Sequence, residues 1–160
     1  MADDMFLIVE DVTGESKDET YKNQCQIQSW NWGMVAPGNF HEGPGGSTGK
    51  TQAHDISITM YFDFSTTTFM KFIAEHKHPK TAKIVCRKSG GDDKKLEYLV
   101  MEMKPLIISA LNVSGGGSEY PMVSLSLNFA EITVTYKTQS DVGDAAPENV
   151  FSRDFSASSS

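Results

Sequence analysis

Apolar and polar residues alternate along most of this chain, and a period of two places successive side chains on opposite faces of a β-strand. This pattern predicts a mainly β protein. The clearest alternating stretches predict strands over residues 5–12, 24–34, 53–62, 81–88, 95–103, 106–113 and 122–136. Seven or eight strands at such short spacing are typical of a β-sandwich or a β-barrel.

The alternation changes phase within two of these strands. In the last strand the apolar residues occupy odd positions up to Phe129 and even positions from Ile132 onward. A similar slip falls at residues 28–29 of the second strand. A phase change in a period-two pattern indicates an inserted residue, so we predict β-bulges at 28–29 and at 130–131. Because bulges bend and twist strands, both slips favour a closed, strongly curved barrel over a flat sandwich.

One segment follows a helical period instead. Its apolar face is expected from residues spaced i, i+3, i+4 and i+7, namely Phe69, Phe72, Ile73 and His76. Ser65 is available as the N-cap, and Pro79 stands just beyond the expected end. The sequence therefore predicts one amphipathic α-helix that packs across one mouth or side of the barrel.

Length and composition indicate a single soluble domain. The chain has 160 residues, of which 39% are hydrophobic, and its 21 acidic and 14 basic side chains give a formal net charge of −7. A chain of this length buries about 70% of its extended-chain surface, so neither a disulfide nor a metal is needed to hold the core. Phosphate binding is driven by clustered positive charge, and no dense Lys/Arg patch is present. We therefore expect no nucleic-acid or anionic-membrane partner.

The N-terminal residues do not resemble a secretory signal peptide. Asp3 and Asp4 stand where such a peptide carries positive charge, and the apolar run 5–9 is too short for its hydrophobic region or for a membrane span. We expect no signal peptide, no membrane insertion and folding in the cytoplasm.

The four histidines give little support for catalysis or metal binding. His76 and His78 follow Glu75 at the end of the expected helix, but a metal site there lacks a distant further ligand. His54 precedes Asp55 at the start of a strand, yet no serine or cysteine stands in a nucleophile motif beside it. The sequence therefore predicts no enzyme activity, no metal and no cofactor.

The two cysteines and one glycine-rich segment also have structural interpretations. Cys25 and Cys86 share strand parity with apolar neighbours, which predicts buried free thiols. Segment 43–50 ends in Gly-Lys as a phosphate-binding loop does, but it leads into a strand, whereas a phosphate-binding loop opens a helix. A flexible contact loop is the better interpretation.

The longest stretch without a regular pattern covers residues 33–50. Loops beyond about 12 to 15 residues are uncommon in compact domains unless they bind something or are disordered. We expect this loop to have no secondary structure of its own and to make a contact, with the candidate residues Gly38, His41, Gly43, Pro44, Gly45, Gly46 and Lys50.

Small polar side chains oppose the apolar ones on two strands. Trp30 and Trp32 flank Asn31, so burial of both indoles turns Asn31 to the other face of the sheet. Asp55, Ser57 and Thr59 alternate with Ile56, Ile58 and Met60 in the same way. This polar face is either an ordinary solvated surface or the lining of a cavity or channel.

Several short motifs follow one another in a specific order. They are Gly14-Glu15-Ser16, Trp30-x-Trp32-Gly33, Arg87-Lys88-x-Gly90-Gly91, Glu97-Tyr98-Leu99 and Leu127-Asn128-Phe129-Ala130. Each motif alone is weak, but their order and spacing together are specific. Across residues 4–137 the chain resembles the Hcp family, the haemolysin-coregulated proteins that build the inner tube of the bacterial type VI secretion system.

This resemblance implies a closed β-barrel of two sheets with one flanking helix, related to phage tail tube proteins. It implies homohexameric rings that stack into a tube, with the sheath, spike and baseplate proteins as partners and effector proteins held in the lumen. Such a protein is secreted through the machine, is associated with virulence and is not an enzyme. We expect residues 1–137 to form the Hcp-like domain, and residues 138–160 a C-terminal segment with a possible short strand and a frayed end.

The resemblance also gives roles to the candidate residues. Asn31, Ser57 and Thr59 are expected on the lumen side, in contact with cargo, and the loop candidates from Gly38 to Lys50 are expected to contact the next ring. Two other functions remain open. The first is a tube subunit of a phage-like contractile injection system, which the gene neighbourhood would distinguish from an Hcp protein. The second is a monomeric β-barrel ligand-binding module, which its lower mass in solution would distinguish from a ring.

Overall fold

The computed structural model describes residues 4–41, 47–48, 50–89, 95–117, 119–138 and 147–156, and the structural statements below concern these residues. They form a mainly β protein with one α-helix, as the alternation predicts. No helix in these ranges is both long enough and apolar enough to cross a membrane.

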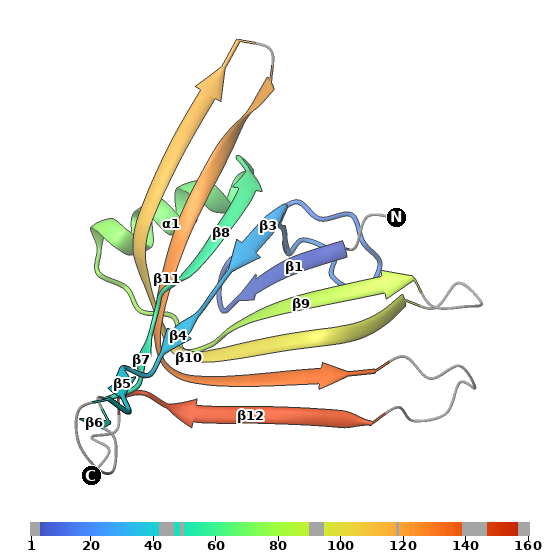
Figure 1. The fold of residues 1–160 in the computed structure, drawn as a ribbon. Helices are drawn as coiled ribbons and strands as arrows, with labels where there is room; N and C mark the ends of the chain where they lie inside the picture. Colours follow the sequence, from blue (N-terminus) through green and yellow to red (C-terminus); the bar gives the residue numbers. More distant parts are fainter. Residues whose placement is uncertain are drawn as a thin grey trace.

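The main sheet has the strand order β2-β1-β9-β10-β11-β8-β3, and β12 pairs with β11 outside this path (Figure 1). All of its neighbouring strands are antiparallel. The strands are β1 (Asp4–Val9), β2 (Cys25–Gln26), β3 (Ser29–Asn31), β8 (Ile56–Tyr61), β9 (Ala82–Ser89), β10 (Lys95–Gly116), β11 (Glu119–Lys137) and β12 (Glu148–Asp154).

The predicted strand over 24–34 is interrupted rather than bulged. Its first part, β2, pairs with β1 at one end of the sheet, and its second part, β3, pairs with β8 at the other end. Between them the Ile27 amide donates to the Met5 carbonyl oxygen at 3.0 Å, and the Gln28 amide donates to that of Thr59 at 2.8 Å. The predicted bulge at 28–29 is therefore wrong. The sheet is a half-barrel, and its closure into a barrel of two sheets stays a prediction.

The predicted bulge at 130–131 is also wrong. Lys104 pairs with Glu131 and Leu106 pairs with Phe129, so the register between β10 and β11 continues here without an extra residue. The two predicted strands 95–103 and 106–113 are accordingly one long strand, β10.

A bend shared by both strands causes the change of phase instead. The buried positions change from Met103 to Leu106 on β10 and from Phe129 to Ile132 on β11, so each strand exchanges its buried face at the same level. Figure 1 shows both strands turning there. A bend in a paired ribbon produces the same sequence pattern as an inserted residue, which explains the incorrect prediction.

The apolar faces of the strands meet in one core. The residues predicted to face inward lie in it on β8 and, on β11, as far as Ile132, whereas Tyr136 is 45% exposed. Phe69 and Phe72 of the helix complete the core. Its fully buried side chains include Leu7, Ile56, Ile58, Met60, Ile84, Met101, Met103, Leu106, Leu125 and Leu127. Cys25 and Cys86 are both buried and are not joined in a disulfide, as predicted.

Helix α1 (Phe64–Ala74) begins two residues earlier than predicted, with Asp63 as its N-cap. The Asp63 carboxylate accepts the Ser65 amide at 2.9 Å, and the Thr66 hydroxyl oxygen accepts the Asp63 amide at 3.1 Å. This reciprocal pair is a capping box with threonine in the usual Glu/Gln position. Ser65 was the expected cap, but it lies buried in the first turn.

The helix ends before His76, which was predicted to lie on its apolar face. The His76 amide donates to the Ile73 carbonyl oxygen at 3.3 Å and the Lys77 amide to that of Phe72 at 2.9 Å, which together form a Schellman motif. His76 has a φ of 54° and an exposed side chain. The spacing of His76 is therefore coincidental, because the chain has already left the helical path.

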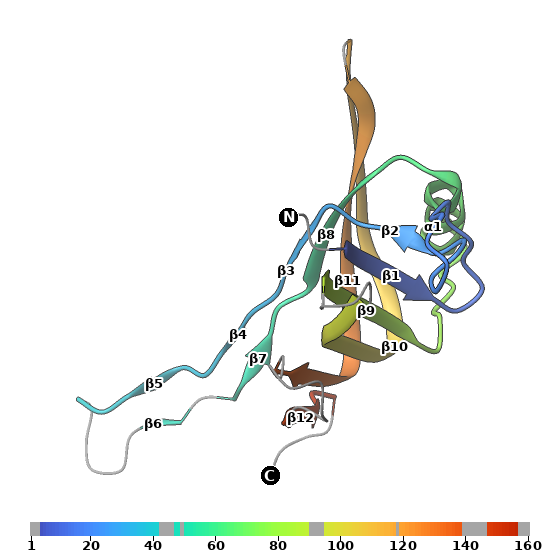
Figure 2. The ribbon, with the colours of Figure 1, turned by 90° about the vertical axis from the view of Figure 1, so that its right-hand side faces the viewer.

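The long loop has secondary structure of its own, contrary to expectation. Strand β4 (Met34–Val35) pairs with β7 (Gln52–Ala53), and β5 (Gly38–Asn39) pairs with β6 (Ser47–Thr48). Figure 2 shows these strands as a narrow two-stranded arm that projects away from the main sheet. We call residues 34–53 the arm.

The segment between β1 and β2 covers the other face of the sheet. Here Arg87 is 4% exposed, its guanidinium lies 2.5 Å from an Asp18 carboxylate oxygen and 3.3 Å from one of Asp4, and it stacks over the Phe6 ring at 4.7 Å from the centroid. Tyr21 stacks on Phe6 with a centroid distance of 5.1 Å. These contacts attach the segment to β1 and β9.

Candidate functional site

A continuous face of small, mostly polar side chains lies opposite the core on β3, β8, β10 and β11. The strand register places Asn31 beside Ser57 and Ser57 beside Ser126 in one row. We call this the polar face and define it by its outward residues, which are Ser29, Asn31, Asp55, Ser57, Thr59, Ile107, Ser109, Ala110, Asn112, Ser124, Ser126 and Asn128. All three residues predicted for the lumen belong to it.

The two tryptophans orient Asn31 as the alternation predicts. Trp30 and Trp32 are half-buried and pack against the core, which is less complete burial than expected. The Trp32 indole N–H donates to the His54 carbonyl oxygen at 2.9 Å, and its ring lies 6.0 Å from that of Phe129. Asn31, between them, is exposed on the polar face.

A β-bulge adds a hydroxyl group to the polar face. The register between β10 and β11 shifts between Ile108 and Ala110, so Ser109 is an extra residue on β10. A bulge redirects side chains, and here the Ser109 hydroxyl lies 2.6 Å from Asp55 Oδ2 and 3.0 Å from the Ser126 carbonyl oxygen. Apolar residues stand at both odd and even positions around Ser109, namely Ile107, Ile108, Ala110 and Leu111, so alternation alone did not locate this bulge.

Asp55 is held from a second side by an amide. Asn128 Nδ2 donates to Asp55 Oδ1 at 2.8 Å, so each carboxylate oxygen accepts one hydrogen bond from a neutral group. The possible pairing of Asp55 with His54 has no support in these contacts, because the carboxylate is oriented by Ser109 and Asn128. The sequence analysis did not identify this cluster, since its members lie up to 73 positions apart.

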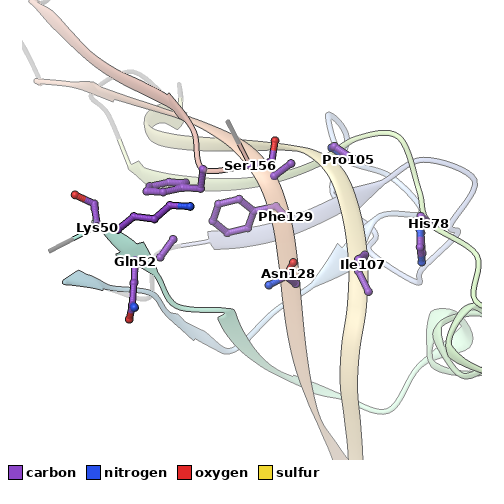
Figure 3. Close-up of a pocket in the computed structure, with 12 residues that line it drawn as sticks. Lys50, Gln52, His78, Pro105, Ile107, Asn128, Phe129 and Ser156 are labelled. Atoms are coloured by element: carbon purple, nitrogen blue, oxygen red, sulfur yellow. The ribbon is translucent and has the colours of Figure 1, made fainter. Parts of the chain in front are cut away.

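An open groove of about 640 Å³ adjoins the polar face where the arm leaves the sheet (Figure 3). Ile107 and Asn128 of the polar face line one side of the groove, and Lys50 of the arm lines another. Figure 3 shows the Lys50 side chain extending toward Phe129. Phe155, which follows β12, adds a second aromatic wall.

The loop candidates fall partly within the described arm. Gly38 lies in β5, and His41 and Lys50 are exposed. The candidates Gly43, Pro44, Gly45 and Gly46 lie outside the described residues. Phe40 was not among the candidates, yet it is 93% exposed on the arm. An aromatic residue in a glycine-rich stretch was the signal that could have identified it.

The described residues contain no cluster of potential metal ligands, and Cys25 is deeply buried. Within those ranges no three His, Cys, Asp or Glu side chains are grouped closely enough to hold a metal ion. Burial raises the pKa of the Cys25 thiol to about 12, so this cysteine is a neutral thiol at physiological pH.

Comparison with known proteins gives a consistent result. Residues 6–136 match the family model described as "Type VI secretion system effector, Hcp". The protein hcp1 of Pseudomonas aeruginosa is 39% identical over 140 residues, which cover 87% of this chain and 86% of that protein.

Solved structures share the fold over nearly the whole chain. Hcp1 from Salmonella typhimurium matches with a TM-score of 0.76 and 27% identity, over 98% of this chain and 96% of that one. A structure described as a type six secretion system protein matches with a TM-score of 0.86 over 96% of both chains, and at 21% identity this similarity concerns the fold alone.

Proposed function

The chain belongs to the Hcp family of type VI secretion tube proteins, a family of structural secreted proteins rather than of enzymes, and from this premise we propose that it forms homohexameric rings that stack into the inner tube of the machine. The sheath, baseplate and spike proteins are its partners in the machine. Effector proteins occupy the lumen, and the chain is exported from the cytoplasm with them. It has no catalytic activity of its own.

The observation that carries this proposal is the polar face. A two-faced sheet buries one side in the core, and here the opposite side carries mainly hydroxyl and amide groups along four strands. Such a face suits the wall of a water-filled channel, because it offers hydrogen bonds without a large apolar patch.

The same proposal includes closure of the barrel. Strands β2 and β3 lie at opposite ends of the sheet path, but only Ile27 and Gln28 separate them along the chain. Their amides bond to β1 and β8 respectively, so this segment joins the two ends. We assign residues 1–137 to this Hcp-like domain and residues 138–160 to a C-terminal extension that adds β12 to the sheet.

Ring formation is tested by mass and by electron microscopy of the purified chain. We expect a particle of about six times the 17.6 kDa of one chain, with a central hole. Particles of monomer mass would contradict the proposal and would favour a monomeric ligand-binding module. A ring whose gene lies beside phage-like injection genes would point to that class of tube instead.

Contact of the polar face with cargo is tested at Asn31. Asn31→Gln keeps the amide but lengthens the side chain, so we expect unchanged ring mass and thermal stability with weaker co-purification of effectors. Loss of the ring would place Asn31 in an interface, and unchanged effector retention would exclude it from the cargo contact.

We also propose that the arm contacts the next ring. Shortening segment 43–49 should leave single rings intact and reduce their stacking and secretion. Normal secretion of the shortened protein would show that the arm is not a stacking element.

A further inference from the structure

The polar face carries one formal charge among its twelve residues, and that charge is the carboxylate of Asp55. The remaining residues of the face are neutral. Within this face the Asp55 carboxylate therefore supplies the net charge, while Lys50 lies in the adjoining groove.

The geometry of Asp55 fixes this charge without cancelling it. Its two oxygens accept hydrogen bonds from the Ser109 hydroxyl at 2.6 Å and from the Asn128 amide at 2.8 Å, and both donors are neutral. Neutral donors orient a carboxylate and leave its net charge in place. Among the described residues no Lys or Arg forms an ion pair with Asp55, including Lys50 of the adjoining groove.

The location of the cluster keeps it accessible to a bound chain. Ser109 and Asn128 are exposed and Asp55 is half-buried, so the carboxylate lies at the surface of the sheet. The bulge at Ser109 and the neighbouring strand β11 hold both donors on rigid sheet structure. The orientation of the carboxylate is thus set before any cargo arrives, which lowers the entropic cost of binding.

We propose that the polar face prefers cargo segments in which Lys or Arg stands among hydroxyl and amide side chains, and that Asp55 determines this preference. The inference rests on the proposed lumen and adds the class of cargo that the lumen retains. The charge of Asp55 attracts a cation in direct contact, while the surrounding hydroxyls and amides bond to the polar groups between the cations. Six copies repeat the contact around the ring, so a weak preference per subunit is multiplied for cargo that spans several subunits.

The size of the effect is limited by solvent. An exposed ion pair in water contributes little, and salt screens charges beyond about 8 Å at physiological ionic strength. We expect the ring to bind a basic segment about three- to tenfold more tightly than an acidic one at low salt, with the difference shrinking as salt is added.

Fluorescence anisotropy with three labelled 12-residue peptides tests this preference. All three are built on Ser and Asn, and they carry four Lys, four Glu or no charged residue. Titration with the full-length protein at 50 mM and 300 mM NaCl gives the affinity ratio. Asp55→Asn should bring the Lys-to-Glu ratio close to one. Glu102→Gln is the matched control, because it removes an equal charge from an exposed position of β10 outside the polar face and should preserve the ratio.

A second variant tests the proposal in the opposite direction. Asn112 is an exposed member of the polar face, so Asn112→Asp adds a carboxylate and should increase the preference for the Lys peptide. The inference is overturned if the unmodified ring binds no peptide or shows no charge preference. It is also overturned if neither Asp55→Asn nor Asn112→Asp changes the ratio of the affinities for the Lys and Glu peptides. The mass of the same samples separates the two proposals. A monomer contradicts the tube function, whereas intact rings without a charge preference contradict only the role of Asp55.

Discussion

At the scale of single residues, Gly14 occupies a position that no side chain fits. A Cβ there would lie 2.6 Å from the Gln24 carbonyl oxygen and 2.9 Å from the Cys25 Cα, both of which are backbone atoms. We expect Gly14→Ala to lower the free energy of unfolding by about 1–3 kcal/mol, measured by urea denaturation. Gly115→Ala is the control, because nothing lies within 4 Å of its added Cβ. Equal effects at both sites would refute this explanation.

His76 is a residue whose replacement should stabilise the protein. It holds the left-handed position of the Schellman motif with a φ of 54°, a conformation that glycine adopts without steric cost. Its exposed side chain contributes little packing. We expect His76→Gly to raise the free energy of unfolding by about 0.5–1 kcal/mol. His78→Gly removes the same side chain where φ is not positive, so thermal denaturation should show no gain for that variant.

At the scale of elements, the segment from Gly14 to Asn23 is attached to β9 through an ion pair that depends on pH. The hydrogen bond from Arg87, supported by the amides of Tyr21 and Thr20, lowers the pKa of Asp18 from 3.8 to about 2. Because the folded pKa lies below the unfolded one, the stabilisation is complete above about pH 4 and disappears as the pH falls toward 2.

Asp18→Asn tests this attachment by thermal denaturation between pH 7 and pH 2. The variant should lose about 1–3 kcal/mol at pH 7, because Arg87 is buried and loses one of its carboxylate partners. It should also lose less further stability than the unmodified protein between pH 4 and pH 2. Glu19→Gln removes an exposed carboxylate of the same segment and should retain the original acid response. Identical acid responses of all three proteins would exclude Asp18 as the titrating group.

The sequence predicted the strands and their buried faces more reliably than it predicted their bulges and bends. Alternation correctly placed Ile56 and Ile58 in the core and Ser57 on the opposite face, since a period of two leaves no other arrangement. It misassigned residues 130–131, because a bend shared by two paired strands and an inserted residue produce the same change of phase. The bulge at Ser109 was not predicted, because it is defined by the pairing of β10 with β11 rather than by a local sequence pattern.

At the scale of the whole molecule, the contacts that build the candidate site are long-range. Asp55 and Asn128 are 73 positions apart, and on the other face of the sheet Arg87 and Asp18, which attach the segment between β1 and β2, are 69 apart. Local propensity contains no information about such pairs. Alternation therefore placed Asn31, Asp55, Ser57 and Thr59 on the polar face, but it did not predict that Ser109 and Asn128 orient the Asp55 carboxylate. The strands of the arm were not predicted for the same reason. Each is only two residues long and is defined by its pairing, of β4 with β7 and of β5 with β6, rather than by a local sequence pattern.

The arm also exposes a large apolar side chain. Phe40 is 93% exposed, and the arm extends away from the sheet on the side opposite α1 (Figure 2). Burial of a phenylalanine side chain contributes about 1.5–3 kcal/mol, and a six-fold contact between rings would repeat that gain at every subunit. The expected use of Phe40 is therefore a contact made on stacking.

Phe40→Ser should consequently leave the thermal stability and the mass of single rings unchanged, because the side chain makes little contact before stacking. Stacked rings should become several-fold less frequent in electron micrographs at equal protein concentration. Phe40→Tyr is the matched control, because it keeps the aromatic ring and should retain most of the stacking. If the serine variant forms tubes as often as the tyrosine variant, the exposed ring is not what holds neighbouring rings together. If it instead lowers the melting temperature of the monomer, Phe40 packs within its own subunit in solution, and the contact between rings must be sought on another surface.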